Sequence, residues 1–296
     1  MSNPQILLGN QNRVKWLAMS QDSQKPKMIE NNAIKIISLN IEKDRHILEV
    51  LEFLNKENAD VICLQEIFSE TFELFKEKMN MFGVFDPQAT FKNDNGEILI
   101  QGVAILSKSP VVDSKAIIYS EEVKDVYELS LSYHPEKDAD KGAVNRQYSR
   151  NLLTASIQNE KTGSLKIATT HFTWGYYGYV DKETKEFVWD LDDTSIKQQI
   201  DDAERLLKIL DNLDEVIFCV DSNAPRGYKV FDLFAEKLKD NIPKEYTTSI
   251  DGNIHRAGHL PLMVDGIFTT PKHNAKNVVL KNGISDHMAV VCEISK

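Results

Sequence analysis

The sequence predicts a layered αβ single domain, because short apolar runs typical of strands alternate with amphipathic helical patterns. Several runs are continuously apolar and β-branched, such as Ile34–Ile41 and Glu215–Val220, as expected of strands covered on both faces. The helical patterns, such as residues 195–213, place apolar residues at steps of three and four. Since no Pro-, Gly- or Ser-rich linker separates the two kinds of pattern, both belong to one layered domain.

The individual elements are expected within residues 33–296, which form the predicted domain, after a polar leader over residues 1–32. Strands are expected at Ile34–Ile41, Asp60–Leu64, Gln101–Leu106, Lys115–Tyr119, Leu152–Ile157, Leu165–Thr170, Glu215–Val220, Val264–Thr269 and His287–Ile294. Helices are expected over residues 44–57, 195–213 and Val230–Leu238. The polar segment His134–Gln147 is interpreted as an insertion within the domain.

Composition excludes several classes of protein. With 296 residues, 42% of them hydrophobic and 27% charged, the chain is neither disordered nor fibrous. No apolar run approaches the ~20 residues that cross a bilayer, and the first thirty residues lack the basic start and apolar core of a secretory signal. We therefore expect a soluble, cytoplasmic protein whose Cys63, Cys219 and Cys292, each inside an apolar run, are buried and reduced.

The net charge limits the ways in which the protein can bind nucleic acid. There are 35 Lys and Arg against 45 Asp and Glu, and 35 − 45 gives −10. Non-specific coating of nucleic acid needs an excess of basic residues that neutralise phosphates, so this charge argues against it. An enzyme that holds one phosphate in a local cleft remains compatible with the charge.

Polar side chains stand where the expected buried strands end. Asn40, Gln65-Glu66, His171 and Asp221-Ser222-Asn223 each follow an apolar run, Asp265 opens one, and Ser285-Asp286-His287 precede the last. Buried strands that share an edge bring their ends to one rim of a sheet, where ligands bind in layered αβ folds. Carboxylates, carboxamides and imidazoles at one rim predict a hard-cation site with phosphate contacts.

Each position also has a purely structural interpretation. Glu66 is compatible with a carboxylate before a helix over residues 68–80, Asp221 with an Asx turn, and His287 with a buried core histidine. Asn40 could simply end a strand, and Asp265 could cap a turn. The joint pattern favours a functional site, because independent turn chemistry would not select these residue types at so many strand ends.

In this order along the chain, the motifs resemble those of the endonuclease/exonuclease/phosphatase superfamily. They are Ser38-Leu39-Asn40, Leu64-Gln65-Glu66, Thr170-His171, Asp221-Ser222-Asn223, Val264-Asp265 and Ser285-Asp286-His287. That superfamily includes deoxyribonuclease-I-like nucleases, apurinic endonucleases, sphingomyelinases and inositol polyphosphate phosphatases. The resemblance spans residue 34 to the C-terminus, and it implies an α/β fold: a four-layered α/β/β/α sandwich of two packed mixed sheets flanked by helices.

The resemblance also implies a metal site and a group that activates water. Glu66 is expected as the principal metal ligand, with Asp286 and Asn40 close to the ion or its waters. Oxygen-rich ligands favour Mg²⁺ or Mn²⁺ over Zn²⁺. Asp221 is expected to orient or deprotonate the attacking water, and Asn223 to hold a phosphate oxygen.

Two histidines are given roles by the same resemblance. His287 is expected to contact the phosphate or to act as the base, with Asp265 fixing its tautomer. The sequence leaves open whether Asp221 or His287 takes the proton. His171 is expected to donate a hydrogen bond to a phosphate oxygen or to protonate the leaving group, and a buried strand histidine is the structural alternative.

Candidate substrate-binding residues lie between the motifs. Arg150 opens a run similar to a family strand whose Arg lies near the cleft, although a surface Arg is an alternative. Trp174 and Tyr176 begin an aromatic stretch that predicts a β-hairpin beside the rim. Its aromatic faces would stack on a base or another ring, lie on a lipid surface, or pack against the body. Residues Asn253–Leu262 contact substrate or face solvent.

The main hypothesis is therefore a divalent-metal-dependent phosphoester hydrolase, a phosphodiesterase or nuclease acting on a phosphoester substrate such as nucleic acid. The acidic charge and the aromatic hairpin leave two enzymatic alternatives. These are a lipid phosphoesterase that touches the membrane surface, similar to a sphingomyelinase, and a small-molecule phosphoesterase, similar to an inositol phosphatase. A third hypothesis is a catalytically silent binding module on the same fold.

Overall fold

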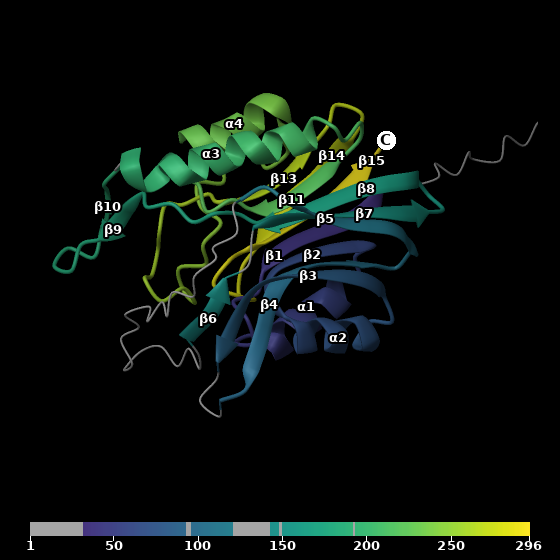
Figure 1. The fold of residues 1–296 in the computed structure, drawn as a ribbon, viewed down its shortest axis with the longest axis horizontal. Helices are drawn as coiled ribbons and strands as arrows, with labels where there is room; N and C mark the ends of the chain where they lie inside the picture. Colours follow the sequence, from purple (N-terminus) through teal and green to yellow (C-terminus); the bar gives the residue numbers. More distant parts are fainter. Residues whose placement is uncertain (1–31, 93–95, 121–142, 148–149, 192) are drawn as a thin grey trace, which may run out of the picture. The chain divides into compact units, whose positions relative to one another are not determined.

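The computed structural model describes residues 32–92, 96–120, 143–147, 150–191 and 193–296 (Figure 1). The predicted leader, apart from its last residue, and most of the predicted insertion His134–Gln147 lie outside the described residues. Residues Asn32–Lys296 belong to one compact unit, and all of the structure discussed below lies in it.

Two mixed sheets form the centre of this unit. The first is seven-stranded and runs in the order β14 (Asn274–Lys281), β15 (Ala289–Ser295), β1 (Ile34–Asn40), β2 (Val61–Phe68), β4 (Ile98–Ser107), β3 (Phe82–Lys92) and β6 (Ala143–Gln147). The second is six-stranded, in the order β12 (Lys239–Asp240), β13 (Asp265–Thr269), β11 (Ile217–Asp221), β8 (Gly163–His171), β7 (Asn151–Asn159) and β5 (Val111–Ile118). Each sheet has one parallel pair, β1 with β2 and β8 with β11.

Helices cover the outer face of each sheet. In Figure 1, α1 (Ile47–Glu57) and α2 (Ser69–Lys78) lie on the first sheet, and α3 (Asp193–Leu210) and α4 (Lys229–Lys237) lie on the second. Buried apolar side chains form one cluster between the sheets and one under each pair of helices. The four-layered α/β/β/α sandwich implied by the resemblance is therefore confirmed.

This layering explains why the strand sequences are continuously apolar. Successive side chains of a strand point to opposite faces. In β2, Val61 and Cys63 belong to the cluster between the sheets, whereas Ile62 and Leu64 belong to the cluster under α1 and α2. Both faces of the strand are therefore buried. Because neither face meets solvent, apolar and polar residues do not alternate along this run.

Four strands of the two sheets were not expected from the sequence: β3, β6, which falls within the predicted insertion, β12 and β14. Two of them show the physical reason. β3 contains Pro87, which argues against a strand because proline cannot donate to the ladder; the structure accommodates it where the register against β4 shifts between Pro87 and Ala89. β14 is an edge strand whose side chains are mostly exposed or half-buried. Its polar sequence therefore carries no strand pattern, and pairing with β15 holds it in the sheet.

Candidate active site

The first sheet brings three of the motifs to one edge. β1 and β2 run parallel, and Asn40 at the end of β1 is the register partner of Gln65. β15 runs antiparallel to β1, so Asp286, three residues before β15, lies at the same edge. Gln65 also faces the second sheet, because its Nε2 donates to Thr169 Oγ1 at 3.0 Å.

The second sheet brings its motifs to an edge in the same way. β8 and β11 run parallel, and His171 is the register partner of Asp221. β13 runs antiparallel to β11, which places Asp265, its first residue, opposite Asp221. Asn40 Nδ2 donates to Asp221 Oδ2 at 2.9 Å, so the two polar edges meet.

Glu66 reaches this site through an irregularity in β2. The register of β2 against β4 shifts between Leu64 and Ile67. Leu64 and Ile67 both belong to the cluster under the helices, although side chains three residues apart normally point to opposite faces. This phase change is a β-bulge, and Glu66 within it has φ +54°. A left-handed conformation costs a non-glycine residue of order 1–3 kcal/mol and persists where the surrounding structure imposes it.

Asp221 lies at the centre of the site. It is 1% exposed, and its Oδ1 accepts a hydrogen bond from the backbone N–H of Asn223 at 3.0 Å. Besides the Asn40 amide, two imidazoles approach its Oδ2: His171 Nε2 at 3.6 Å and His287 Nε2 at 3.8 Å. Asn223, with φ +49°, donates from Nδ2 to the Phe172 carbonyl at 2.9 Å, which fixes its side chain.

His287 and Asp265 form a buried hydrogen-bonded pair. His287 Nδ1 lies 2.8 Å from Asp265 Oδ2. Burial lowers the pKa of His287, but the carboxylates of Asp265, Asp221 and Asp286 outweigh it and raise that pKa well above its usual value. Burial and Asp221 raise the pKa of Asp265 despite its histidine partner. His287 is therefore the natural location of a positive charge among these carboxylates.

Two carboxylates on the first-sheet side differ in how their charge is compensated. Burial raises the pKa of Glu66, but Lys43, with Nζ 3.4 Å from Oε2, and the two site histidines lower it to about 2. Burial raises the pKa of Asp286 to about 6; His287 opposes this, and Glu42 and Glu66 add to it. At Asp286, burial and the neighbouring carboxylates therefore outweigh the positive charge of His287.

The contributions of Glu42 and Lys43 are not predicted by the sequence. Both residues lie between the expected strand Ile34–Ile41 and the expected helix over residues 44–57, and α1 begins only at Ile47. Both residues have positive φ, +50° and +66°, and form a turn that brings Lys43 to Glu66. Nothing in residue types or spacing indicates such a turn, because non-glycine residues rarely adopt this conformation.

His171 and Arg150 are coupled at the end of β8. His171 Nε2 lies 3.7 Å from Glu66 Oε1. Burial lowers the pKa of His171, although Asp221 and Glu66 oppose this, and Arg150 adds to the lowering. Arg150 Nη1 donates to the His171 carbonyl at 2.9 Å. Arg150 therefore lies near the site, as expected, and contacts the backbone of His171.

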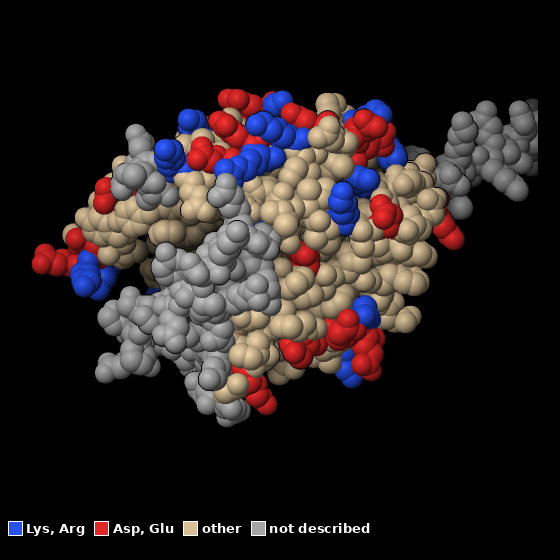
Figure 2. All heavy atoms as spheres, in the orientation of Figure 1, with Lys and Arg blue, Asp and Glu red and all other residues tan. Residues whose placement is uncertain are grey.

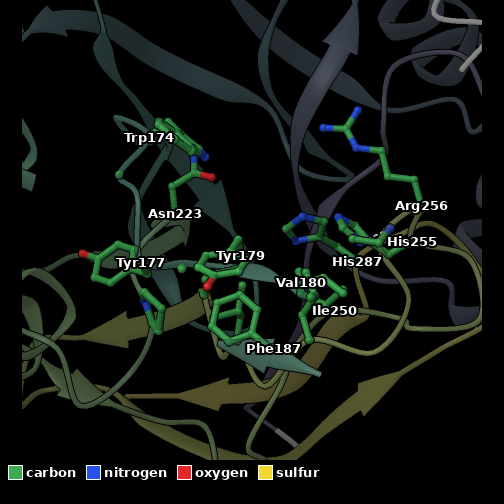
Figure 3. A pocket seen from close by; sticks show the side chains of 17 residues that line it. Trp174, Tyr177, Tyr179, Val180, Phe187, Asn223, Ile250, His255, Arg256 and His287 are labelled. Atoms are coloured by element: carbon green, nitrogen blue, oxygen red, sulfur yellow. Dashed lines mark hydrogen bonds between the residues drawn. The ribbon is translucent and has the colours of Figure 1, made fainter. Parts of the chain in front are cut away.

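The predicted hairpin forms a small two-stranded sheet, β9 (Gly178–Val180) paired with β10 (Phe187–Trp189). Together with residues 250–264 it encloses a pocket of about 350 Å³. Figure 3 shows Asn223 and His287 on its wall, with Trp174 near Asn223 and with His255 and Arg256 near His287. Tyr176 is not a lining residue; its hydroxyl donates to Asp190 Oδ2 at 3.4 Å.

Charges of both signs lie on the surface over the helices of the second sheet. Figure 2 shows Lys and Arg intermingled with Asp and Glu over α3 and α4, at the top of the view. Within the part of the chain that the structure describes, no helix is long and apolar enough to cross a membrane.

Comparison with known proteins identifies the family. The model of the Endonuclease/Exonuclease/phosphatase family matches residues 37–287, which contain every motif described above. The chain belongs to this family. Its members include nucleases and phosphatases, which hydrolyse phosphoesters.

One curated protein similar to this chain is the CCR4-Not complex 3'-5'-exoribonuclease subunit Ccr4 of Phaeosphaeria nodorum. The two are 28% identical over 134 residues. The aligned part is 42% of this chain and only 22% of the length of the relative. Among solved structures, the human Nocturnin catalytic domain with bound sulfate is 17% identical, covers 89% of this chain and 93% of its own, and has a TM-score of 0.60. D. rerio TDP2 in complex with a single-strand DNA product is 16% identical, with coverage of 89% and 99% and a TM-score of 0.57. At these identities the structural likeness shows the fold.

Proposed function

We propose that residues 33–296 act as one catalytic domain, a divalent-metal-dependent phosphodiesterase of the nuclease type. The observation that carries the proposal is the convergence of Glu66, Asn40 and Asp286 from one sheet with Asp221 and His171 from the other. Such a set of carboxylates, carboxamides and imidazoles at the meeting edges of two sheets suits phosphoester hydrolysis.

The donor chemistry fits a hard divalent cation. We propose Glu66 and Asp286 as its ligands, with Asn40 Oδ1 close to it. The raised pKa of Asp286 supports this, because burial and the neighbouring carboxylates leave negative charge that a cation would neutralise. Oxygen ligands without cysteine favour Mg²⁺ or Mn²⁺. When bound, the ion would neutralise charge that develops on the phosphate.

A second group of possible ligands is less suitable. Asp221, Asp265 and His287 bring their ligand atoms within 4.8 Å of one another. However, His287 Nδ1 and Asp265 Oδ2 are already hydrogen-bonded to each other at 2.8 Å, and a metal there would have to break this buried pair. We therefore assign this group to proton handling rather than to metal binding.

The remaining residues are assigned by their contacts. We propose that Asp221 orients and deprotonates the attacking water, since Asn40 and the backbone of Asn223 hold its carboxylate in place. The protonated His287, oriented by Asp265, would donate through Nε2 to a phosphate oxygen. The amide of Asn223 has a second N–H, which we assign to another phosphate oxygen.

His171 is assigned to the leaving-group side. Its Nε2 faces both Glu66 and Asp221, and its lowered pKa makes the neutral form dominant at neutral pH. The neutral imidazole can donate one hydrogen bond to a phosphate or leaving oxygen. We propose that Arg150 positions His171 through the backbone contact and contributes positive charge near the phosphate.

The test is hydrolysis of bis(p-nitrophenyl) phosphate by the full chain in Mg²⁺ and in EDTA. Glu66→Gln and Asp286→Asn keep the side-chain shapes, and each should lower Mg²⁺-dependent kcat by at least about 100-fold, as for other lost charge-stabilising groups. Asp202→Asn is the control, because Asp202 is a buried carboxylate on α3 that bonds to Thr173 and is not one of the proposed ligands.

Undiminished hydrolysis in both variants would refute the ligand assignment. Absence of metal-dependent hydrolysis in the wild-type protein, together with no heat of Mg²⁺ or Mn²⁺ binding in calorimetry, would favour the silent binding module.

A further inference from the structure

The pocket beside the site has walls of two different kinds. The hairpin segment supplies aromatic rings, Trp174, Tyr177, Tyr179 and Phe187, and the segment of residues 250–264 supplies the opposite wall. Figure 3 shows the rings of Tyr179 and Phe187 on one side and the imidazoles of His255 and His287 on the other. Because Asn223 and His287 line the same cavity, whatever occupies it is adjacent to the phosphate-binding groups.

The aromatic wall is anchored and therefore preformed. Val180 and Phe187 pack against the buried cluster of Ile250, Leu260 and Val264. On the other side of the hairpin, the ring of Trp189 stacks on Tyr228, next to the start of α4, with centroids 4.8 Å apart and an interplanar angle of 22°. A preformed pocket does not lose loop entropy when it binds a ligand.

Two of the lining rings are largely exposed to solvent, although Trp174 also contacts the ring of Tyr176, with centroids 6.3 Å apart. Trp174 is 64% exposed and Tyr179 is 46% exposed, whereas Tyr177 in the same segment is buried, with its hydroxyl donating to Gln199 Oε1 at 2.7 Å. Exposed aromatic rings beside a cavity are costly to keep in water and offer flat faces for stacking. Their position therefore indicates a planar ligand.

Polar groups at the opposite wall suit the edge of such a ligand. His255 Nδ1 accepts a hydrogen bond from the backbone N–H of Ala257 at 3.2 Å, which leaves the ring proton on Nε2 in the neutral imidazole. Burial, His287 and Arg256 together lower the pKa of His255 to about 4. His255 and Arg256 are thus hydrogen-bond donors, and Asn223 carries an amide that both donates and accepts.

We propose that this pocket binds one unpaired nucleobase attached to the phosphoester that is hydrolysed. The proposal rests on the proposed phosphodiesterase function and names its substrate class. The cavity, at about 350 Å³, lies at the small end of the range for ligand pockets, so it suits a single nucleoside rather than an acyl chain. A polyol ring would lack the flat face that the aromatic wall favours.

A base within a duplex is stacked and paired, and leaving it costs a few kcal/mol. The substrate is therefore a nucleotide ester or the single-stranded part of a nucleic acid. These two sources share the same chemistry at the pocket, and the length of the attached strand distinguishes them.

The experiment compares substrates with and without an accessible base. The wild-type chain in Mg²⁺ is given a single-stranded oligonucleotide, the same strand with tetrahydrofuran abasic residues, the same strand in a duplex, and thymidine 5′-(p-nitrophenyl phosphate). We expect the base-containing single strand to be cleaved at least tenfold faster than the abasic strand and the duplex, or the thymidine ester to be cleaved at least tenfold faster than bis(p-nitrophenyl) phosphate, which has the same leaving group and no base. A base effect confined to the thymidine ester would identify a nucleotide esterase, and a base effect on the strand would identify a single-strand nuclease.

Substitutions in the pocket then test whether the exposed aromatic rings cause the preference for a base. Trp174→Ala combined with Tyr179→Ala should lower kcat/KM for the base-containing substrate about 5- to 150-fold, the range expected for loss of stacking on one base. The same double variant should leave cleavage of the abasic strand unchanged. Val188→Ala is the matched control, because Val188 is an exposed hairpin residue that does not line the pocket.

Three results would overturn the proposal. These are equal cleavage of base-containing and base-free substrates of both kinds, strand and nitrophenyl ester, by the wild-type chain, equal loss on both substrates in the double variant, and vesicle binding that depends on Trp174 without an effect on oligonucleotide cleavage. The vesicles are phosphatidylcholine with phosphatidylserine. Failure of the proposed function itself gives a different result, namely no metal-dependent cleavage of any of these substrates.

Discussion

Replacing Asp265 by Asn removes one charge from the buried pair while keeping the size of the side chain. The His287 Nδ1 to Asp265 Oδ2 distance is 2.8 Å, and Asp265 is 1% exposed. A hydrogen bond to a charged group is worth about 1.5–3 kcal/mol, and each 1.36 kcal/mol of barrier is tenfold in rate. If the pair orients His287 in the transition state, kcat/KM for a p-nitrophenyl phosphodiester should fall about 10- to 150-fold.

Stability should fall together with activity. Burial raises the pKa of the Asp265 carboxyl, so removing its charge relieves desolvation, but the change also leaves the protonated His287 buried without its hydrogen-bonded carboxylate. Because breaking a buried pair by removing one partner costs about 3–5 kcal/mol, the free energy of unfolding in urea should fall by up to about that amount. Asp202→Asn is a matched control, since Asp202 is also 1% exposed and burial raises its pKa, but it should leave kcat/KM unchanged. The reasoning is refuted if Asp265→Asn retains kcat/KM within about threefold, a change smaller than any charged hydrogen bond predicts.

Two further predictions concern the scaffold. Burial raises the pKa of Glu57, but Lys281 and Lys35 outweigh it, so that the pKa in the folded state is below its usual value. This stabilisation is fully present above the unfolded-state pKa, about 4.3, and is lost as pH falls through the folded-state pKa. Glu57→Gln should therefore lower the free energy of unfolding by about 1 kcal/mol at pH 7, and by progressively less below about pH 4. Urea denaturation at several pH values measures this difference. A difference that stays constant with pH would contradict the role given to the two lysines. At Gly102, an added Cβ would lie 1.9 Å from the backbone oxygen of Asp86 in β3. Gly102→Ala should therefore lower the free energy of unfolding by more than about 2 kcal/mol. An unchanged midpoint of thermal unfolding would show that β3 and β4 can move apart at this point without loss of stability.

The sequence predicted the strand ends because a strand covered on both faces gives a strong apolar signal that stops abruptly. That signal located Asn40, His171 and Asp221 at the correct ends, and the parallel pairing of their strands placed them at neighbouring edges. The aromatic hairpin was also predictable, since its two arms flank a polar turn. These features depend on local patterns of residue type, which periodicity detects.

Other features depend on backbone geometry that residue types do not encode. The bulge that turns Glu66 toward the site requires a positive φ at a residue with no preference for it. The turn at Glu42 and Lys43 is similar, and it places Lys43 Nζ 3.4 Å from Glu66 Oε2. The pocket was not predicted either, because it forms between the hairpin and residues 250–264, which the chain separates widely and tertiary packing brings together.

The bond between Asn40 and Asp221 joins side chains that belong to different sheets. Each sheet by itself therefore carries only half of the chemistry, and a refolding molecule whose sheets have formed separately would be inactive. In a stopped-flow refolding experiment, the return of hydrolysis should coincide with burial of the layer between the sheets and lag behind the far-UV signal of strand formation. The rate at which hydrolysis returns would then report the rate at which the two sheets pack together.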